Sequence, residues 1–340
     1  MSPWMTPAVD KERGLFILGI GSSAPQQPEL AGTNGEYPDR LYQGSTVALD
    51  YRTGELKWWA QHHSDMWNDD AVYDRILVTT PVNPNPPSPL GINPNIDPNE
   101  SRDLVIGSFS KDAIFYAYDR SDGEFLYARP TAYQNIIAGY DGTTGAYEIE
   151  PEAIMTADIE HEATICRENR QIPQGAYSPL TNAYYVPAFN GPCSVMKLNS
   201  LEPSLDTGYN TSYIATVPTP AGHLGQPEAI NVSTGESLWR LERETPLYGM
   251  LTTGGGLLFA ADTNRRFHAV DQWTGKTLWT TILNGASDMA PISYAVNGKQ
   301  YIAVFAPSGT QAAAQHAGQL GLSATTGVAN VGHTLFVFSL

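Results

Sequence analysis

The chain has 340 residues, of which 41% are hydrophobic and 31 are glycine and 25 proline, and its formal net charge is −16. This composition is typical of a folded globular protein with many turns and favours an all-β chain. The negative charge repels phosphate backbones and no apolar run reaches transmembrane length, so we expect no nucleic acid partner and no membrane span.

A short pattern of strand, turn and aromatic residue recurs four times along the chain. Each copy has alternating apolar residues, then a polar turn ending in glycine, then a second alternating stretch that ends in Trp or Tyr. This pattern predicts a β-hairpin whose glycine takes a positive φ and whose aromatic residue packs on the next unit. The four copies are ALDYRTGELKW (48–58), AYDRSDGEFLY (117–127), AINVSTGESLW (229–239) and AVDQWTGKTLW (269–279).

Further strand-like segments precede most copies, such as RGLFILGIG (13–21) and GGGLLFAAD (254–262). Groups of about four strands that each end in a packing aromatic residue indicate a β-propeller rather than a sandwich. We therefore expect a single partial propeller domain over 1–340 with roughly five blades. The expected blades cover about 1–64, 65–130, 131–243, 244–285 and 286–340.

Two other features are interpreted as surface elements. The acidic stretch 142–164 is expected to be a solvated loop, and His62 and His63 are expected to be a pair at the rim. The seven histidines show no metal-binding spacing.

Five segments, in order along the chain, resemble the pyrroloquinoline quinone-dependent (quinoprotein) alcohol dehydrogenases, which are eight-bladed propellers. The resemblance covers nearly the whole chain but only the C-terminal part of such an enzyme. It implies oxidation of an alcohol by hydride transfer to the quinone, with a cytochrome c or similar protein as electron acceptor. The segments are WMTPAVDKERGLFILGIGSSAP (4–25), ALDYRTGELKWWAQHHSDMWNDDAVYD (48–74), GSFSKDAIFYAYDRSDG (107–123), YSPLTNAYYVPAFNGPC (177–193) and GGGLLFAAD with AVDQWTGKTLW (254–279).

The resemblance also implies which residues bind the cofactor. Trp4 matches the indole that stacks under the quinone ring, and Lys111 matches the cation beside the quinone oxygens. An amide near the quinone is supplied by Gln171 or by Asn169. The alternatives for the first two are a tryptophan that packs between blades and a solvated loop lysine.

The sequence departs from the family where the proton acceptor and the metal are bound. Asn68 stands where the family has an aspartate, and an amide cannot act as a base. We therefore expect Asp69 to be the catalytic carboxylate, or Asp70 if the loop is displaced. Ser22 and Asn68 match Ca²⁺ ligands, but both are neutral, which implies a weakened site.

Cys166 and Cys193 match a disulfide of the family, although from the residues alone two free thiols remain an alternative. A disulfide implies an oxidising compartment, here the periplasm, while no signal peptide is visible in the first residues. Roughly five blades would leave open propeller edges, through which the chain could associate with another. A second hypothesis for function is a non-catalytic propeller-repeat scaffold or binding protein.

Overall fold

The structure is a computed structural model that describes residues 3–22, 41–64, 67, 69–156, 158–168, 174–200, 211–307 and 332–339. These residues are almost entirely antiparallel β-structure of the propeller type, which confirms the expected fold class, and the one helical turn among them is a 3₁₀ turn at Pro151–Ala153. The chain divides into a first unit, Met1–Glu168 with Pro192–Pro220, and a second unit, Asn169–Gly191 with Ala221–Leu340.

The described residues of the first unit form four antiparallel sheets. The alternating burial of β2 shows how its sequence specifies the fold, because Leu15 and Ile17 point into the core while Phe16 between them is exposed. The sheets are β1 (Ala8–Asp10), β2 (Leu15–Ile20), β3 (Ser45–Asp50) and β4 (Leu56–Gln61); β5 (Ile76–Pro81), β7 (Ser101–Gly107), β8 (Ile114–Asp119), β9 (Phe125–Pro130) and β6 (Gly91–Ile92); β10 (Ile137–Tyr140) and β11 (Tyr147–Ile149); and β12 (Ala163–Ile165), β15 (Cys193–Leu198) and β16 (Thr211–Val217).

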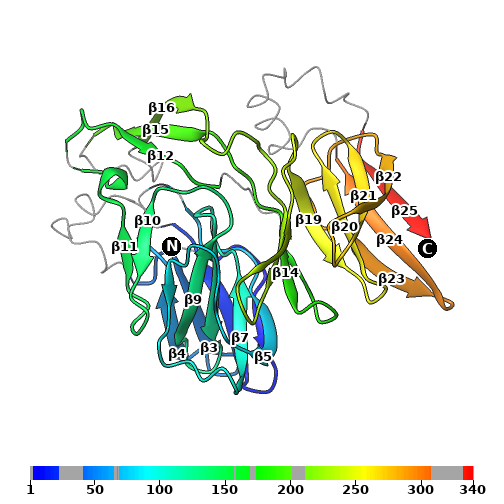
Figure 1. The fold of residues 1–340 in the computed structure, drawn as a ribbon, viewed down its shortest axis with the longest axis horizontal. Helices are drawn as coiled ribbons and strands as arrows, with labels where there is room; N and C mark the ends of the chain where they lie inside the picture. Colours follow the sequence, from blue (N-terminus) through cyan, green and yellow to red (C-terminus); the bar gives the residue numbers. More distant parts are fainter. Residues whose placement is uncertain are drawn as a thin grey trace. The chain divides into compact units, whose positions relative to one another are not determined.

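In the second unit, the part of the chain that the structure describes forms three sheets. The second and third of these pack on each other through an apolar cluster that includes Phe259, Phe267 and Val304. Figure 1 shows these two sheets as the yellow strands and the orange and red strands. The sheets are β13 (Ala176–Ser178), β14 (Ala183–Val186), β17 (Glu228–Asn231) and β18 (Ser237–Arg240); β19 (Leu247–Thr252), β20 (Leu257–Asp262), β21 (Arg266–Asp271) and β22 (Thr277–Ile282); and β23 (Ile292–Val296), β24 (Lys299–Ala306) and β25 (Thr334–Ser339).

The repeated sequence pattern forms the predicted hairpin, and its tryptophan docks on the next sheet. Trp58 Nε1 donates a hydrogen bond of 3.0 Å to the carbonyl of Arg120, and a Cβ on Gly123 would lie 2.7 Å from the Trp58 ring. Trp239 makes the same contact in the second unit, with 2.9 Å from Nε1 to the carbonyl of Gln272. The turn glycine therefore leaves room for the indole of the preceding hairpin.

The two surface interpretations are wrong. His62 and His63 are fully buried, because β4 leads directly into the interior of the first unit. Within 142–164, Ala153 and Met155 belong to the main apolar cluster of that unit. The acidic residues of the stretch lie before and after these two apolar residues in the sequence, so its composition hides the buried positions.

Candidate functional site

Asp70 is the carboxylate around which two of the predicted site residues meet. The backbone N–H and the hydroxyl of Ser22 donate to Asp70 Oδ1 over 3.1 and 3.0 Å. On the other side, Lys111 Nζ lies 3.4 Å from Asp70 Oδ2. Ser22 follows β2, Asp70 follows β4 and Lys111 follows β7, so three separate segments converge on one carboxylate.

The exposure of these groups differs in a way that matters for chemistry. The side chain of Lys111 is 6% exposed and that of Asp70 is 17% exposed. An ammonium group removed from water attracts negative charge more strongly than one in bulk solvent. Asp70 therefore combines access to solvent with contact to a nearly buried cation.

Asp69, the neighbour of Asp70, has a different environment. It is fully buried and forms an ion pair with Arg167, which is 3% exposed. Its carboxylate is thus held by a guanidinium group rather than presented beside Ser22 and Lys111. Asn68 lies outside the described residues.

The segment that carries these carboxylates is anchored on both sides. Trp67 is fully buried, and its indole N–H donates to the carbonyl of Ala153 over 2.9 Å. After Asp70, the guanidinium of Arg75 donates to the carbonyls of Ala71 and Tyr73 over 2.7 and 2.5 Å. Burial lowers the pKa of Arg75 to about 9.

Lys111 is flanked by two residues that fix its own loop. Asp112 Oδ2 accepts a hydrogen bond of 2.6 Å from the Tyr116 hydroxyl and lies 3.5 Å from His63 Nε2. His63 Nε2 also lies 3.2 Å from Ser110 Oγ. These contacts, all between buried side chains, hold the backbone of Lys111 from both directions.

The other residues predicted to bind the cofactor are Trp4 and either Gln171 or Asn169. The side chain of Trp4 is 45% exposed and precedes β1. Gln171 and Asn169 lie outside the described residues. Their assignment to the quinone stays a prediction.

Cys166 and Cys193 form the predicted disulfide, with an S–S distance of 2.03 Å and a Cα–Cα distance of 4.2 Å. The bond joins β15 to the residue that follows β12 in the same small sheet. Asn135 Oδ1 accepts a hydrogen bond of 2.7 Å from the Cys166 N–H, so a third segment holds the same point.

Oxygen ligands for a metal are few among the described residues. No group of three or more His, Cys, Asp or Glu side chains that could hold a metal ion occurs there. Among the described side chains, the Asp70 carboxylate and the Ser22 hydroxyl are the oxygens that meet here, whereas Ca²⁺ takes six to eight. These two residues alone do not form a calcium site.

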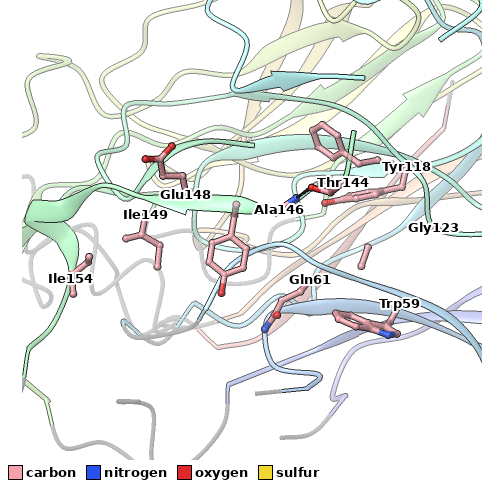
Figure 2. Close-up of a pocket in the computed structure, with 13 residues that line it drawn as sticks. Trp59, Gln61, Tyr118, Gly123, Thr144, Ala146, Glu148, Ile149 and Ile154 are labelled. Carbon is pink, nitrogen blue, oxygen red and sulfur yellow. Dashed lines mark hydrogen bonds between the residues drawn. The ribbon is translucent and has the colours of Figure 1, made fainter. Parts of the chain in front are cut away.

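A separate cavity of about 700 Å³ lies in the first unit beside β4 and the β10–β11 hairpin (Figure 2). Its walls are mainly aromatic and aliphatic, and none of its lining residues belongs to the Asp70 site. The lining includes Trp59, Tyr118, Phe125, Tyr147, Ile149 and Ile154, with Gln61 and Glu148 as polar members. The Ala146 N–H donates to Thr144 Oγ1 over 3.2 Å in the hairpin turn that borders it.

Sequence reasoning missed Arg75 and Arg167, which are both nearly buried. Arginine is usually exposed, and neither residue belongs to a recognisable local motif, so only the tertiary contacts identify them. Asp69, the carboxylate partner of Arg167, is predictable from the sequence because it follows Trp67 in a segment that resembles the family.

Comparisons with known proteins give a consistent result. The family described as "PQQ: Glucose/ethanol/alcohol dehydrogenase, beta-propeller domain" matches residues 1–90 and 216–302, which together are more than half of the chain. The dehydrogenase subunit of an alcohol dehydrogenase (quinone) from Komagataeibacter europaeus is 27% identical over 316 residues, or 88% of this chain and 40% of that protein. A 1-butanol dehydrogenase (cytochrome c) from Thauera butanivorans is 28% identical over 297 residues, or 83% of this chain and 40% of that protein.

Among solved structures, the quinohemoprotein alcohol dehydrogenase from Comamonas testosteroni superposes with a TM-score of 0.80 and 22% sequence identity. The match covers 99% of this chain and 48% of that one, and it shows the shared fold. The chain spans about 40% of the length of the two relatives above. No helix in the described ranges is long and apolar enough to cross a membrane.

Proposed function

Because this chain belongs to the PQQ family of glucose, ethanol and alcohol dehydrogenase β-propellers, we propose that it supplies the C-terminal part of a quinoprotein dehydrogenase. The proposed reaction is oxidation of an alcohol by hydride transfer to pyrroloquinoline quinone. The observation that carries the proposal is the meeting of Ser22, Asp70 and Lys111 at one carboxylate.

In this proposal Asp70 accepts the hydroxyl proton of the alcohol. A carboxylate can take up a proton at neutral pH, which the amide of Asn68 cannot. Asp69 was the carboxylate expected from the sequence, but its ion pair with Arg167 makes Asp70 the better candidate.

Lys111 stabilises negative charge that develops next to it during the reaction. Its ammonium is nearly buried, and a cation fixed in a poorly solvated site does not have to reorganise as charge develops. When bound, pyrroloquinoline quinone supplies the hydride acceptor for the carbinol carbon. Lys111 and Trp4 are the described residues that would hold it, with Gln171 or Asn169 as the proposed amide contact.

Calcium belongs to the proposal only as a weakened site. Ser22 and Asp70 provide too few oxygens by themselves, and Asn68 is the further ligand proposed from the sequence. No step of the proposed reaction therefore depends on the ion.

The proposed electron acceptor is a cytochrome c or a similar protein. One relative is a 1-butanol dehydrogenase whose name includes cytochrome c. The Cys166–Cys193 disulfide favours an oxidising compartment, for which we propose the periplasm.

The test is reconstitution of the purified chain with pyrroloquinoline quinone and Ca²⁺, followed by alcohol-dependent reduction of an artificial electron acceptor. We expect activity that falls about 10²–10³-fold in Lys111→Ala, since a fixed electrostatic contact of this kind contributes that much. Lys276→Ala, at an exposed lysine in the second unit, is the matched control. Equal activity in both variants would overturn the assignment of Lys111, and a folded chain that neither binds quinone nor turns over would support the scaffold hypothesis.

A further inference from the structure

We propose that Arg167 is a positioning residue for this site, which fixes the segment carrying Asp70 through its buried ion pair with Asp69. The catalytic meaning of this inference rests on the proposed function. The structural part does not, because it concerns only how residues of the first unit hold one another.

Asp69 and Arg167 form an ion pair away from water. Asp69 is fully buried and Arg167 is 3% exposed. A charge this far from water is strongly penalised unless a partner of opposite sign stays beside it. Asp69 therefore cannot leave Arg167 without a large penalty, and the backbone at Asp69 is fixed to the position of the guanidinium.

Arg167 is itself held in place. Its neighbour Cys166 is joined by the disulfide to Cys193 at the start of β15. Asn135 accepts a hydrogen bond from the Cys166 N–H and donates its own N–H to the Cys166 carbonyl over 3.1 Å. Arg167 Nη2 also lies 3.2 Å from the Tyr213 hydroxyl of β16. The small sheet of β12, β15 and β16 thus acts as a rigid support.

The backbone connects this support to the site. Asp69 and Asp70 are adjacent, so their Cα atoms are about 3.8 Å apart and a shift of one moves the other. On the other side of the segment, the Trp67 indole N–H donates a hydrogen bond to the carbonyl of Ala153, in the 3₁₀ turn that precedes β12. Ala153 before β12 and Arg167 after β12 therefore hold the segment, at Trp67 and at Asp69. Asp70 is left in contact with Ser22 and Lys111.

Arginine is suited to this role in a way that lysine is not. Its guanidinium is a planar fork with five N–H donors that fixes a carboxylate in orientation as well as in distance, whereas an ammonium acts as a point charge. Arg167→Lys should therefore keep the charge balance of the pair but lose part of its geometric control.

The experiment measures the accessibility of Lys111 without any quinone. Folded protein is treated with acetic anhydride, and acetylation of Lys111 is followed by mass spectrometry relative to the exposed Lys276 and Lys299. The variants are Arg167→Met, Arg167→Lys and the neutral pair Asp69→Asn/Arg167→Met. Thermal unfolding of each variant separates loss of position from loss of fold.

We expect Arg167→Met to raise the relative acetylation rate of Lys111 about tenfold, which corresponds to about 1.4 kcal/mol in a local opening equilibrium. Arg167→Lys should give a smaller rise, as a partial rescue. The neutral double variant should recover thermal stability, because it no longer buries a charge without a counter-charge. It should keep the faster acetylation of Lys111, because the guanidinium that orients the segment is still missing. If Arg167→Met does not fold, the lysine variant and the double variant decide the question.

An unchanged Lys111 rate in folded variants would overturn the inference, and so would an equal rise at all lysines. Quinone titration of the same variants is a separate measurement. If Lys111 responds as expected but wild-type protein binds no quinone, the proposed function fails while the positioning role of Arg167 stands. If quinone binds equally well to wild type and variants, Arg167 has no effect on the site and the inference fails alone.

Discussion

Two adjacent carboxylates in the first unit have opposite environments. Asp69 is fully buried against Arg167, whereas Asp70 is partly exposed between Ser22 and Lys111. These neighbours in sequence thus have different partners, although neither lies in a strand. The resemblance to a family identified Ser22 and Lys111 from local motifs. Arg167 could not be predicted in this way, because an ion pair between distant segments leaves no local pattern.

The two carboxylates should respond differently to removal of their charge. We expect Asp70→Asn to lower alcohol-dependent turnover of the reconstituted protein by about 10²–10⁴-fold, the usual contribution of a positioned general base. Its loss of thermal stability should be smaller than that of Asp69→Asn, because the pair of Asp70 with Lys111 is less buried than the pair of Asp69 with Arg167. Asp69→Asn should instead lower the unfolding temperature, because it leaves the Arg167 charge buried without its counter-charge. Turnover and thermal unfolding of both variants test this pair of expectations, and a reversed pattern would assign the base to Asp69.

His62 provides a prediction about pH. Burial, followed by the charge of Arg75, lowers the pKa of His62 well below its ordinary value of 6.5. The unfolded chain therefore binds a proton near pH 6.5 that the folded chain does not bind until lower pH. Stability contributed by the neutral imidazole is complete above pH 6.5 and falls by up to about 1.4 kcal/mol per pH unit below it.

The measurement is urea unfolding of the wild type and His62→Gln between pH 7.5 and 5.5. The variant should lose stability less steeply than the wild type as the pH falls through 6.5. Substitution of His333, whose ring stacks on that of Phe305, provides the control. Equal slopes for wild type and His62→Gln would contradict the expectation.

At the scale of the element, the same type of hairpin recurs in both units. In the first copy, Asp50 Oδ1 accepts hydrogen bonds from the N–H groups of Arg52 and Thr53, both at 2.9 Å. These bonds lower the pKa of Asp50. The hairpins and their tryptophan contacts were predictable because each rests on residues close in sequence. The sheet of β12, β15 and β16 was not predicted, since β12 has only three residues and its pairing with β15 joins positions far apart in sequence, such as Ala163 and Met196.

The turn glycines offer a matched pair for testing the tryptophan contact. Gly54 and Gly123 occupy the same turn position with φ of +74° and +80°, but a Cβ on Gly54 meets nothing within 4 Å, whereas one on Gly123 would be 2.7 Å from Trp58. Gly54→Ala should lower the free energy of unfolding by about 1–2 kcal/mol through the positive φ alone. Gly123→Ala should lower it by about 1–3 kcal/mol more, because it also displaces the indole. Urea unfolding measures both, and equal losses would show that Trp58 adjusts freely.

The disulfide should act on both stability and the site. It closes a loop with a sequence separation of 27, and removal of a native disulfide of this kind lowers the free energy of unfolding by about 2–4 kcal/mol. In Cys166→Ser/Cys193→Ser, or after reduction with a phosphine, we expect a loss of that size together with faster acetylation of Lys111. A loss of stability without any change in the acetylation rate of Lys111 would show that the disulfide does not help to hold Arg167 in place.

For the whole molecule, membership of the family is established, whereas the enzymatic activity is a proposal. The described residues form sheets of the propeller type in both units, and the family match covers more than half of the chain. The relatives whose names specify an activity are about two and a half times as long as the part matched here, since the match covers 40% of each. The association of this chain with others through exposed sheet edges stays a prediction.

The most direct test of the central claim is a calorimetric titration of pyrroloquinoline quinone into the purified chain with Ca²⁺ present, repeated with Lys111→Ala and Lys276→Ala. The account predicts saturable binding to the wild type and to the Lys276 variant, and binding at least tenfold weaker to the Lys111 variant. Binding that is equally strong in all three proteins would contradict the site, and no binding to any of the folded proteins would contradict the proposed role of this chain in holding the quinone.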